Sequence, residues 1–246
     1  MPRGRLLAVV PTYNEAGTVM AVLEGILSRP GAWEALVVDD ASPDGTAGAV
    51  LRVQRRHPGR VHLLRRPAKA GLGSAYRDGL RWGLERGYRF LAQMDADLSH
   101  DPADLPRLAA ALRDADVAVG SRYLGGKVSV VHWPLGRLAL SMAANAYVRA
   151  VTGLALSDCT SGFKVWRREA LAAVGLAGVR SEGYSFQVEL GLLAQRSGFR
   201  LVEVPIVFTD RRDGSSKLDS AVVWEAVWRV WTMRLSGATF PQRRRD

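Results

Sequence analysis

Residues 6–40 read LLAVVPTYNEAGTVMAVLEGILSRPGAWEALVVDD, and this stretch decides the fold class. Leu6–Val10 is a short apolar run that stops at Pro11, which is typical of a strand buried on both faces. Thr18–Ser28 then carries apolar residues at helical spacing, and Ala35–Val38 is a second buried strand. The stretch therefore predicts a strand, a helix and a second strand parallel to the first.

The same alternation continues outward along the chain. We expect a helix, a strand, a helix and a strand, in that order, over Ala47–Arg56, Val61–Leu64, Leu72–Glu85 and Tyr88–Met94. The second half is less regular, and its predicted elements are helices at Asp104–Arg113, Leu135–Val151, Gly183–Ser197 and Ala221–Leu235 and strands at Ala115–Gly120 and Leu201–Phe208. Pro205 makes the last strand an edge or a bulge. We predict an α/β protein with a mostly parallel, Rossmann-like sheet and helices on both faces.

Composition narrows the class of protein. The chain has 246 residues with 34 Lys and Arg against 24 Asp and Glu, a net charge of +10. This charge suits nucleic acid, an anionic membrane surface or a phosphorylated substrate. The single cysteine, Cys159, excludes a disulfide framework and fits a reducing compartment. Residues 3–10 are too short for a signal peptide, and no uncharged run reaches the roughly 18 residues of a membrane span.

Acidic side chains follow several of the predicted strands. Asp39-Asp40 ends the second strand, and Asp95-Ala96-Asp97 follows the strand at residues 88–94. In parallel sheets the ligand crevice lies beyond the carboxyl ends of the strands, so we expect one shared site there. Hard cations such as Mg²⁺ and Mn²⁺ prefer oxygen ligands and bridge protein carboxylates to substrate phosphates. An Asp-x-Asp pattern alone is weak, because surface turns also produce it.

Seven segments, in chain order, carry a resemblance to known enzymes. The segments PTYNE (11–15), VVDDASPDGT (37–46) and DADLSH (95–100) resemble family 2 glycosyltransferases of the GT-A fold. Further segments resemble polyprenol (dolichol) monophosphate mannose synthases: GLGSAY (71–76), GSRY (120–123), TSGFK (160–164) and DRRDGSSK (210–217). The resemblance implies a GT-A catalytic domain over residues 1–217. Residues 218–246 then form a C-terminal amphipathic helix and a basic tail, part of that domain or appended to it.

The resemblance also implies roles for particular residues. The nucleotide sugar is held by Pro11, Tyr13, Glu15, Val38, Asp40, Asp95, Ala96, Asp97, Arg122, Arg211 and Lys217. Asp97 matches the metal ligand, and Asp97, Arg122 and Arg211 are the implied catalytic residues. Arg122 matches the acceptor-phosphate site, and Arg137 is a further candidate on a helix without a motif. Guanidinium groups suit this task because they pair with phosphate oxygens in fixed geometry.

The implied reaction moves mannose from GDP-mannose to a membrane polyprenyl phosphate, with inversion at the anomeric carbon and Mg²⁺ or Mn²⁺ as cofactor. The acceptor phosphate is already ionised, so no strong general base is expected. One alternative is a polyprenyl-phosphate glucosyltransferase, or another family 2 transferase, that uses a UDP-sugar. A nucleic-acid-binding module is a second alternative, but no such motif is present. A catalytically dead scaffold is disfavoured because Asp95 and Asp97 are both present.

The C-terminal segment and the glycine pair near residue 71 carry two further patterns. Trp224, Trp228, Trp231 and Leu235 share one helical face, which suits either a lipid headgroup region or core packing. We expect a peripheral protein on the cytoplasmic face of the membrane, where it could have a membrane-protein partner. The Gly71-x-Gly73 pattern is not a dinucleotide fingerprint, because that motif would follow the first strand.

Overall fold

The computed structural model describes residues 4–209 and 220–235, and it confirms the α/β class. Seven strands form the main sheet in the order β3-β2-β1-β4-β7-β5-β8, with only β7 antiparallel to its neighbours. Their bounds are β1 Leu6–Thr12, β2 Trp33–Asp39, β3 Val61–Arg65, β4 Phe90–Gln93, β5 Val117–Ser121, β7 Lys164–Arg167 and β8 Leu201–Pro205. The predicted mostly parallel sheet is therefore present.

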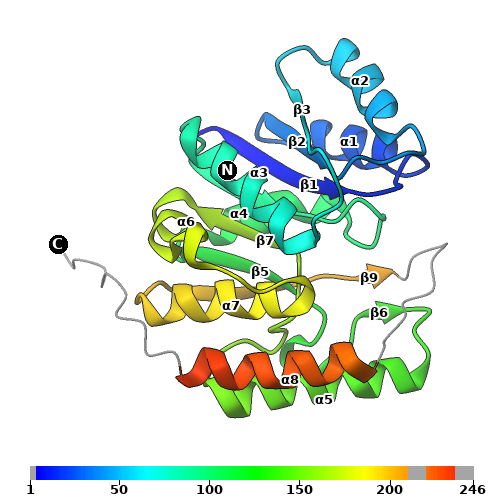
Figure 1. The fold of residues 1–246 in the computed structure, drawn as a ribbon. Coiled ribbons are helices and arrows are strands. Elements are labelled where there is room, and N and C mark those ends of the chain that lie inside the picture. The colour runs from blue at the N-terminus through cyan, green and yellow to red at the C-terminus, as the bar shows by residue number, and fades with distance from the viewer. Residues whose placement is uncertain (1–3, 210–219, 236–246) are drawn as a thin grey trace.

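Helices cover both faces of the sheet, as Figure 1 shows. The α-helices are α1 Val19–Leu27, α2 Thr46–Arg56, α3 Leu72–Glu85, α4 Leu105–Ala111, α5 Leu135–Thr152, α6 Arg168–Val174, α7 Gly183–Arg196 and α8 Ser220–Leu235. Short 3₁₀ turns span η1 Pro102–Asp104, η2 Leu124–Gly126 and η3 Leu176–Gly178. A second, two-stranded parallel sheet pairs β6 Val130–Val131 with β9 Phe208–Thr209.

Two apolar cores lie on opposite faces of the sheet, because neighbouring residues of a strand point to opposite sides. On β1, Leu6 and Ala8 pack with helices α1, α2 and α4, whereas Leu7 and Val9 pack with α3, α6 and α7. Helix α3 approaches the sheet closely, since a Cβ atom built on Gly79 would lie 2.4 Å from the Val9 side chain. The continuous apolar runs of the sequence reflect this burial on both faces.

The structure differs from the predicted strands in several places. Strand β1 continues through Pro11 to Thr12. Proline has no N–H to donate, and this is tolerated because the pairing of β1 with β4 ends at Val9, before Pro11. The run predicted as a single strand over residues 201–208 divides after Pro205 into β8, at the sheet edge, and β9. Strands β6 and β7 were not predicted, since β6 has only two residues and β7, KVWR, begins with the charged Lys164.

Helices α5 and α8 lie side by side at the end of the molecule farthest from α2 (Figure 1). The predicted C-terminal helix is present as α8. Val230 and Met233 are buried against the rest of the protein, while Trp228, Trp231 and Leu235 are exposed. Within its described side chains, α8 thus carries apolar residues on both its buried and its exposed sides. The predicted boundary between residues 217 and 218 lies outside the described residues.

Candidate active site

A pocket of about 170 Å³ lies at the carboxyl ends of β1, β2 and β4, and we call it the sheet-edge pocket. Its walls include seven of the predicted nucleotide-sugar residues, namely Pro11, Tyr13, Glu15, Asp40, Asp95, Ala96 and Asp97. Thr12, Lys69, Gly71, Leu72 and Ala75 complete the lining. Val38 is fully buried in the core beneath the pocket and does not line it. Four segments that are separate in sequence therefore meet at this one edge.

Of the two adjacent carboxylates at the end of β2, Asp39 and Asp40, only Asp40 lines the pocket. Asp39 is fully buried and accepts hydrogen bonds from the hydroxyls of Thr12, at 3.0 Å, and Ser42, at 2.6 Å. Asp40 lines the pocket, lies 3.1 Å from a guanidinium nitrogen of Arg66 and accepts the Ala70 N–H at 3.1 Å. Asp39 thus joins the end of β1 to the loop after β2, while Asp40 fixes the connection between β3 and α3.

The Asp95–Asp97 loop is held by side chains from two of the quoted segments, GLGSAY and DADLSH. The buried Tyr76 hydroxyl donates to Asp95 at 2.7 Å, and the Asp95 N–H donates to His100 Nδ1 at 3.2 Å. Burial, followed by the charge of Asp95, raises the pKa of Tyr76 well above its ordinary value. Burial lowers the pKa of His100, so His100 is neutral and its Nδ1 can accept. The Ser99 hydroxyl donates to Asp97. These contacts fix both carboxylates at the pocket wall.

A second polar network lies beneath the TSGFK segment. Lys164 is fully buried, and its ammonium donates to the Ser161 carbonyl and, at 2.8 Å, to the Gln187 side chain. Burial lowers the pKa of Lys164 to about 7. Gln187 also accepts from Gln93 of β4 at 3.3 Å. This network ties β7 and α7 to the strand that leads into Asp95.

Arg122 lies outside the sheet-edge pocket and is largely buried. Its guanidinium group pairs with the buried Asp158 through two contacts of 2.6 Å and donates to Thr160 at 2.9 Å. Burial alone would lower the pKa of Arg122, but the hydrogen bonds and charge of Asp158 raise it. Its Cζ atom lies 5.5 Å from the Trp133 ring, and that of Arg137 lies 4.3 Å from the same ring.

The structure therefore brings two of the predicted phosphate-binding residues together. Arg122 and Arg137 meet at Trp133, and we call these three residues the arginine–tryptophan cluster. The Phe208 ring of β9 also borders it, 5.3 Å from Arg122 Cζ. The other two predicted cations, Arg211 and Lys217, lie outside the described residues.

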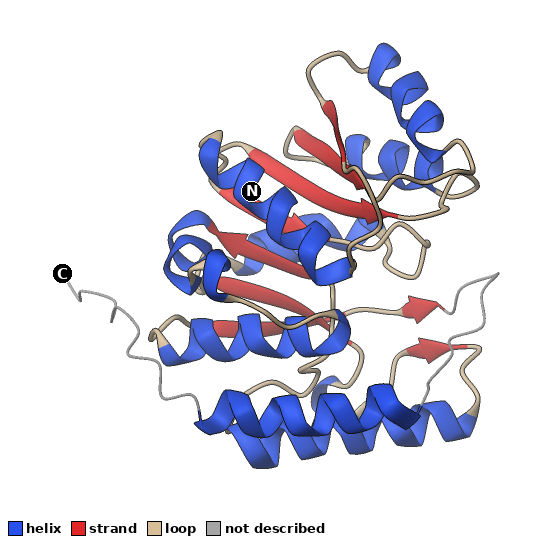
Figure 2. Cartoon of the chain, viewed as in Figure 1, coloured by secondary structure: helices blue, strands red, loops and turns tan. Residues whose placement is uncertain are grey.

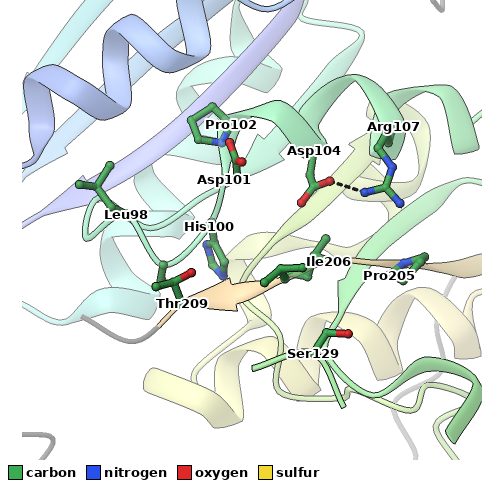
Figure 3. A pocket seen from close by; sticks show the side chains of 12 residues that line it. Leu98, His100, Asp101, Pro102, Asp104, Arg107, Ser129, Pro205, Ile206 and Thr209 are labelled. Carbon is green, nitrogen blue, oxygen red and sulfur yellow. Dashed lines mark hydrogen bonds and ion pairs between the residues drawn. The ribbon is translucent and has the colours of Figure 1, made fainter. Parts of the chain in front are cut away.

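A larger pocket of about 610 Å³ lies on the other side of the loop that follows Asp97, and Figure 3 shows its lining. The charged groups at its wall are already paired within the protein. Asp104 forms an ion pair with Arg107, and Asp101 accepts the Ala103 N–H at 2.8 Å. The sheet-edge pocket is the candidate active site, because carboxylates from two strand ends line that one cavity.

The glycine pair at the start of α3 has a specific partner. The Glu182 carboxylate accepts the N–H groups of Gly73, at 2.8 Å, and Ser74, at 3.2 Å, and pairs with Arg77 at 2.8 Å. A Cβ atom at residue 73 would lie 2.8 Å from the Ser181 carbonyl oxygen. Gly73 is thus required for close packing, and an internal carboxylate occupies the helix N-terminus where a dinucleotide phosphate would bind.

Sequence reasoning missed Lys69, Tyr76 and Glu182. Tyr76 lies within the quoted GLGSAY segment, but its buried contact with Asp95 is set by the packing of α3 on the sheet. Lys69 lies between β3 and α3, outside the quoted segments. Glu182 is more than 100 residues from its partners on α3, so no local pattern could reveal it.

A mostly parallel sheet with an Asp-x-Asp loop at its carboxyl edge, beside a pocket, defines a glycosyltransferase of the GT-A type. The sequence model described as glycosyl transferase family 2 matches residues 7–175, and the chain belongs to this family. The resemblance drawn from the seven segments is thereby confirmed.

Curated relatives agree with this assignment. The chain is 44% identical over 236 residues to the polyprenol monophosphomannose synthase of Mycolicibacterium smegmatis, covering 95% of this chain and 89% of the relative. It is 45% identical over 227 residues to the undecaprenyl-phosphate mannosyltransferase of Micrococcus luteus, covering 92% of each.

Solved structures share the fold at low sequence identity. Glucosyl-3-phosphoglycerate synthase from Mycobacterium tuberculosis, in complex with Mg²⁺ and uridine diphosphate, is 20% identical with a TM-score of 0.68. That match covers 94% of this chain and 79% of the other. The same synthase with Mn²⁺, UDP-glucose and phosphoglyceric acid gives a TM-score of 0.66 at 19% identity, covering 94% of this chain and 79% of the other.

Proposed function

We propose that the protein transfers mannose from GDP-mannose to a polyprenyl phosphate and forms polyprenyl-phosphate mannose with inverted configuration. The observation that carries this proposal is the similarity, over more than nine-tenths of the chain, to two enzymes whose names specify mannose and a polyprenyl acceptor. The sheet-edge pocket supports a nucleotide-sugar donor, because carboxylates, an aromatic ring and a glycine line one cavity.

Asp97 is the proposed ligand of a divalent cation. Mg²⁺ binds through one or two carboxylates together with substrate phosphates, so a single carboxylate at the pocket wall fits such an ion. Ser99 holds the Asp97 side chain by hydrogen bonding. The bound cation would supply positive charge to the diphosphate of the departing nucleotide. The solved relatives with Mg²⁺ or Mn²⁺ and a uridine nucleotide are consistent with this assignment.

The arginine–tryptophan cluster is the proposed binding site of the acceptor phosphate. Asp158 fixes the Arg122 guanidinium group, and the Trp133 ring holds Arg137 nearby. Positive groups there offset the repulsion between the acceptor phosphate and the donor diphosphate. The resemblance assigns Arg211 and Lys217 to the same phosphates. An acceptor oxygen that is already ionised attacks the anomeric carbon without a general base, so catalysis rests on positioning.

We further propose that helices α5 and α8 contact the membrane that holds the acceptor. Their exposed residues include Leu135 (83% exposed), Leu140, Met142, Trp228 (71%), Trp231 and Leu235. The exposed residues of α5 include no carboxylate, and Arg149 adds a basic group, as an anionic lipid surface favours. Among the described residues, no helix is long and apolar enough to cross a membrane.

The proposed location is the cytoplasmic face, where a membrane-protein partner could assist docking. The free, buried Cys159 is consistent with a reducing compartment. Flotation of the purified protein with anionic vesicles at physiological salt tests the docking. Protein that remains at the bottom of the gradient would contradict direct membrane contact.

The chemical proposal is tested by incubating the protein with radiolabelled GDP-mannose, a short polyprenyl phosphate and Mg²⁺ or Mn²⁺. We expect a labelled lipid that survives mild alkali and is cleaved by mild acid. A parallel reaction with UDP-glucose tests the alternative donor. Label in the lipid only with UDP-glucose would replace the proposed function by a glucosyltransferase. In a thermal-shift assay, GDP-mannose should stabilise the fold more than UDP-glucose does.

A further inference from the structure

The buried His100 has contacts in two directions, toward the Asp95–Asp97 loop and toward β9. Its Nδ1 accepts the N–H of Asp95 at 3.2 Å. Its imidazole stacks on the Phe163 ring, with the two ring centres 4.8 Å apart. The Phe208 ring of β9 meets the same imidazole edge-on, with the ring centres 5.6 Å apart. The hydrogen bond and the ring contacts thus use different parts of one side chain.

Phe208 continues this contact to the arginine–tryptophan cluster. The centre of its ring lies 5.3 Å from Arg122 Cζ and 5.5 Å from the centre of the Trp133 ring, which it meets edge-on. An aromatic ring attracts a guanidinium group at such a distance. We call the Asp95–Asp97 loop the donor side and the arginine–tryptophan cluster the acceptor side. One Phe208 ring therefore contacts His100 of the donor side and Arg122 of the acceptor side.

The backbone of β9 makes a parallel connection. The Thr209 N–H donates to the Ser99 carbonyl at 3.4 Å, and the Phe208 N–H donates to the Ser129 carbonyl at 2.9 Å. The Ser129 N–H in turn donates to the Arg122 carbonyl at 2.9 Å. Consecutive residues of β9 are therefore tied to the donor side and to the acceptor side.

The two sides are not joined by direct strand pairing. Asp97 follows β4 and Arg122 follows β5, and β7 lies between these two strands in the sheet. Their relative position therefore depends on what is packed beyond the strand ends. A displacement reaction needs its reacting atoms about 3–3.5 Å apart, and a misplacement of about 1 Å can lower the rate about 100-fold. A link between the two sides thus bears directly on the rate of transfer.

We propose that His100 is a positioning residue that sets the distance between the two substrates. It holds the donor side through its hydrogen bond with Asp95 and the acceptor side through its ring contact with Phe208. His100 acts through these two residues and touches neither substrate. The inference rests on the proposed function, which places the nucleotide sugar at the donor side and the acceptor phosphate at the arginine–tryptophan cluster.

Two substitutions remove the contacts of His100 one at a time. His100→Phe keeps an aromatic ring against Phe208 and loses the acceptor for the Asp95 N–H. His100→Asn keeps an acceptor close to the position of Nδ1 and loses the ring. His57→Asn is the matched control, because His57 lies at the end of α2 and lines neither pocket. The experiment measures kcat, the KM values for GDP-mannose and a short polyprenyl phosphate, and the melting temperature.

The two variants should affect different substrates. His100→Phe should raise the KM for GDP-mannose about tenfold and leave that for polyprenyl phosphate within about twofold, because only the donor side is released. His100→Asn should show the reverse pattern, because only the ring contact is lost. Both should lower kcat about tenfold or more, since either change alters the distance between the substrates. His57→Asn should match the wild type in all three kinetic constants.

A lower melting temperature with unchanged kcat and KM values would mean that His100 only stabilises the fold, and it would overturn the inference. Equal increases of both KM values in both variants would overturn it as well. Phe208→Leu tests the link from the acceptor side if the His100 variants do not fold. It should reproduce the pattern expected of His100→Asn, and an unchanged KM for polyprenyl phosphate would count against the link.

Failure of the proposed function would look different. A wild-type protein that transfers sugar only from a UDP-sugar would contradict the donor, whatever the variants do. The same division of KM values between the two His100 variants, measured with that UDP-sugar, would still support the positioning role. Loss of the division with either donor would contradict it.

Discussion

At the scale of single residues, Asp97 and Asp95 differ in what holds them. Asp95 accepts a hydrogen bond from the buried Tyr76 hydroxyl, and its N–H donates to the buried His100. Contacts with the protein interior therefore fix its position. Asp97 accepts from Ser99 at the pocket wall. This difference supports a structural and nucleotide-side role for Asp95 and a metal-side role for Asp97.

We expect Asp97→Asn to lower the mannose-transfer rate about 100-fold or more, because an amide cannot supply the negative charge that a divalent cation requires. The melting temperature should change little, since the amide oxygen can still accept from Ser99. Transfer assays and thermal unfolding check both expectations. Asp114→Asn, an exposed carboxylate outside the pocket, is the control and should retain full activity. Near-normal turnover of Asp97→Asn would remove the metal assignment.

A second residue-scale prediction concerns Glu34, which lies at the opposite end of the sheet from the pocket. Burial raises the pKa of this carboxyl, but hydrogen bonds from Tyr88, His62 and Arg5 outweigh burial, so the pKa is lowered from 4.5. A carboxyl with a lowered folded-state pKa stabilises the fold above its unfolded pKa. That contribution is lost as the pH falls through the folded-state value.

We therefore expect Glu34→Gln to reduce the free energy of unfolding by about 1–3 kcal/mol at pH 7. The wild type and the variant should converge in stability as the pH falls below 4.5. Urea unfolding at several pH values measures this. Glu85→Gln, at the exposed end of α3, serves as control and should track the wild type. A difference that stays constant down to strongly acidic pH would contradict the linkage.

Only some of the site residues could be predicted from the sequence. The acidic positions after β2 and β4 could be predicted, because carboxyl ends of parallel strands share one edge. The choice of Asp40 over Asp39 came with the resemblance, and the structure places only Asp40 in the pocket. The burial of Arg122 against Asp158 could not be predicted, since the two residues meet only through tertiary packing.

At the scale of elements, α3 connects the site to the core. Its N-terminal residues line the pocket, its Tyr76 holds Asp95, and its glycines allow close contact with β1 and β2. A Cβ atom at Gly79 would lie 2.4 Å from Val9 and 2.9 Å from Val38. Helix α3 can therefore lie this close to the sheet only because residue 79 has no side chain.

We expect Gly79→Ala to lower the free energy of unfolding by about 1–3 kcal/mol, because the added methyl group pushes α3 away from the sheet. Gly48→Ala on α2 is the matched control, since the nearest atom to its Cβ is 4.0 Å away. That substitution should stabilise by up to about 1 kcal/mol through helix propensity. Denaturant unfolding of both variants checks the contrast, and equal effects would rule out the packing explanation.

Helices and strands could be predicted where the spacing of apolar residues matches the side that is buried. The first βαβ unit, α5 and α7 match their predicted ranges within a few residues, because each shows a regular apolar pattern. Strand β7 was missed because four residues carry no usable period and its lysine is buried through contacts with α7. Only the fold around it explains why that segment is a strand.

At the scale of the whole molecule, different helices lie at the two opposite ends of the fold. Helix α2 lies at one end, and the α5–α8 pair lies at the other (Figure 1). The cluster of Arg122, Trp133 and Arg137 belongs to the second end, because Arg137 lies on α5 itself. A lipid acceptor held there would approach the phosphate site from the membrane.

Trp228→Ala should weaken binding to anionic vesicles about tenfold, because a largely exposed indole would lose its place in the headgroup region. Trp231→Ala tests the same surface one helical turn farther on. Leu51→Ala on α2, an apolar residue 42% exposed at the opposite end, is the control. Vesicle co-sedimentation gives the partition constants, and equal binding of all three variants would disprove docking through α8.

Strand β7 also governs the order in which the protein can assemble during synthesis. The four parallel strands β3, β2, β1 and β4 are complete by residue 93, whereas β4 and β5 are joined only through β7, which ends at residue 167. Until that segment leaves the ribosome, β4 presents an open edge that can pair with other chains. Its closure spans more than 70 residues, which makes it a slow, long-range step. The nascent chain is thus most prone to aggregate between these two points of translation.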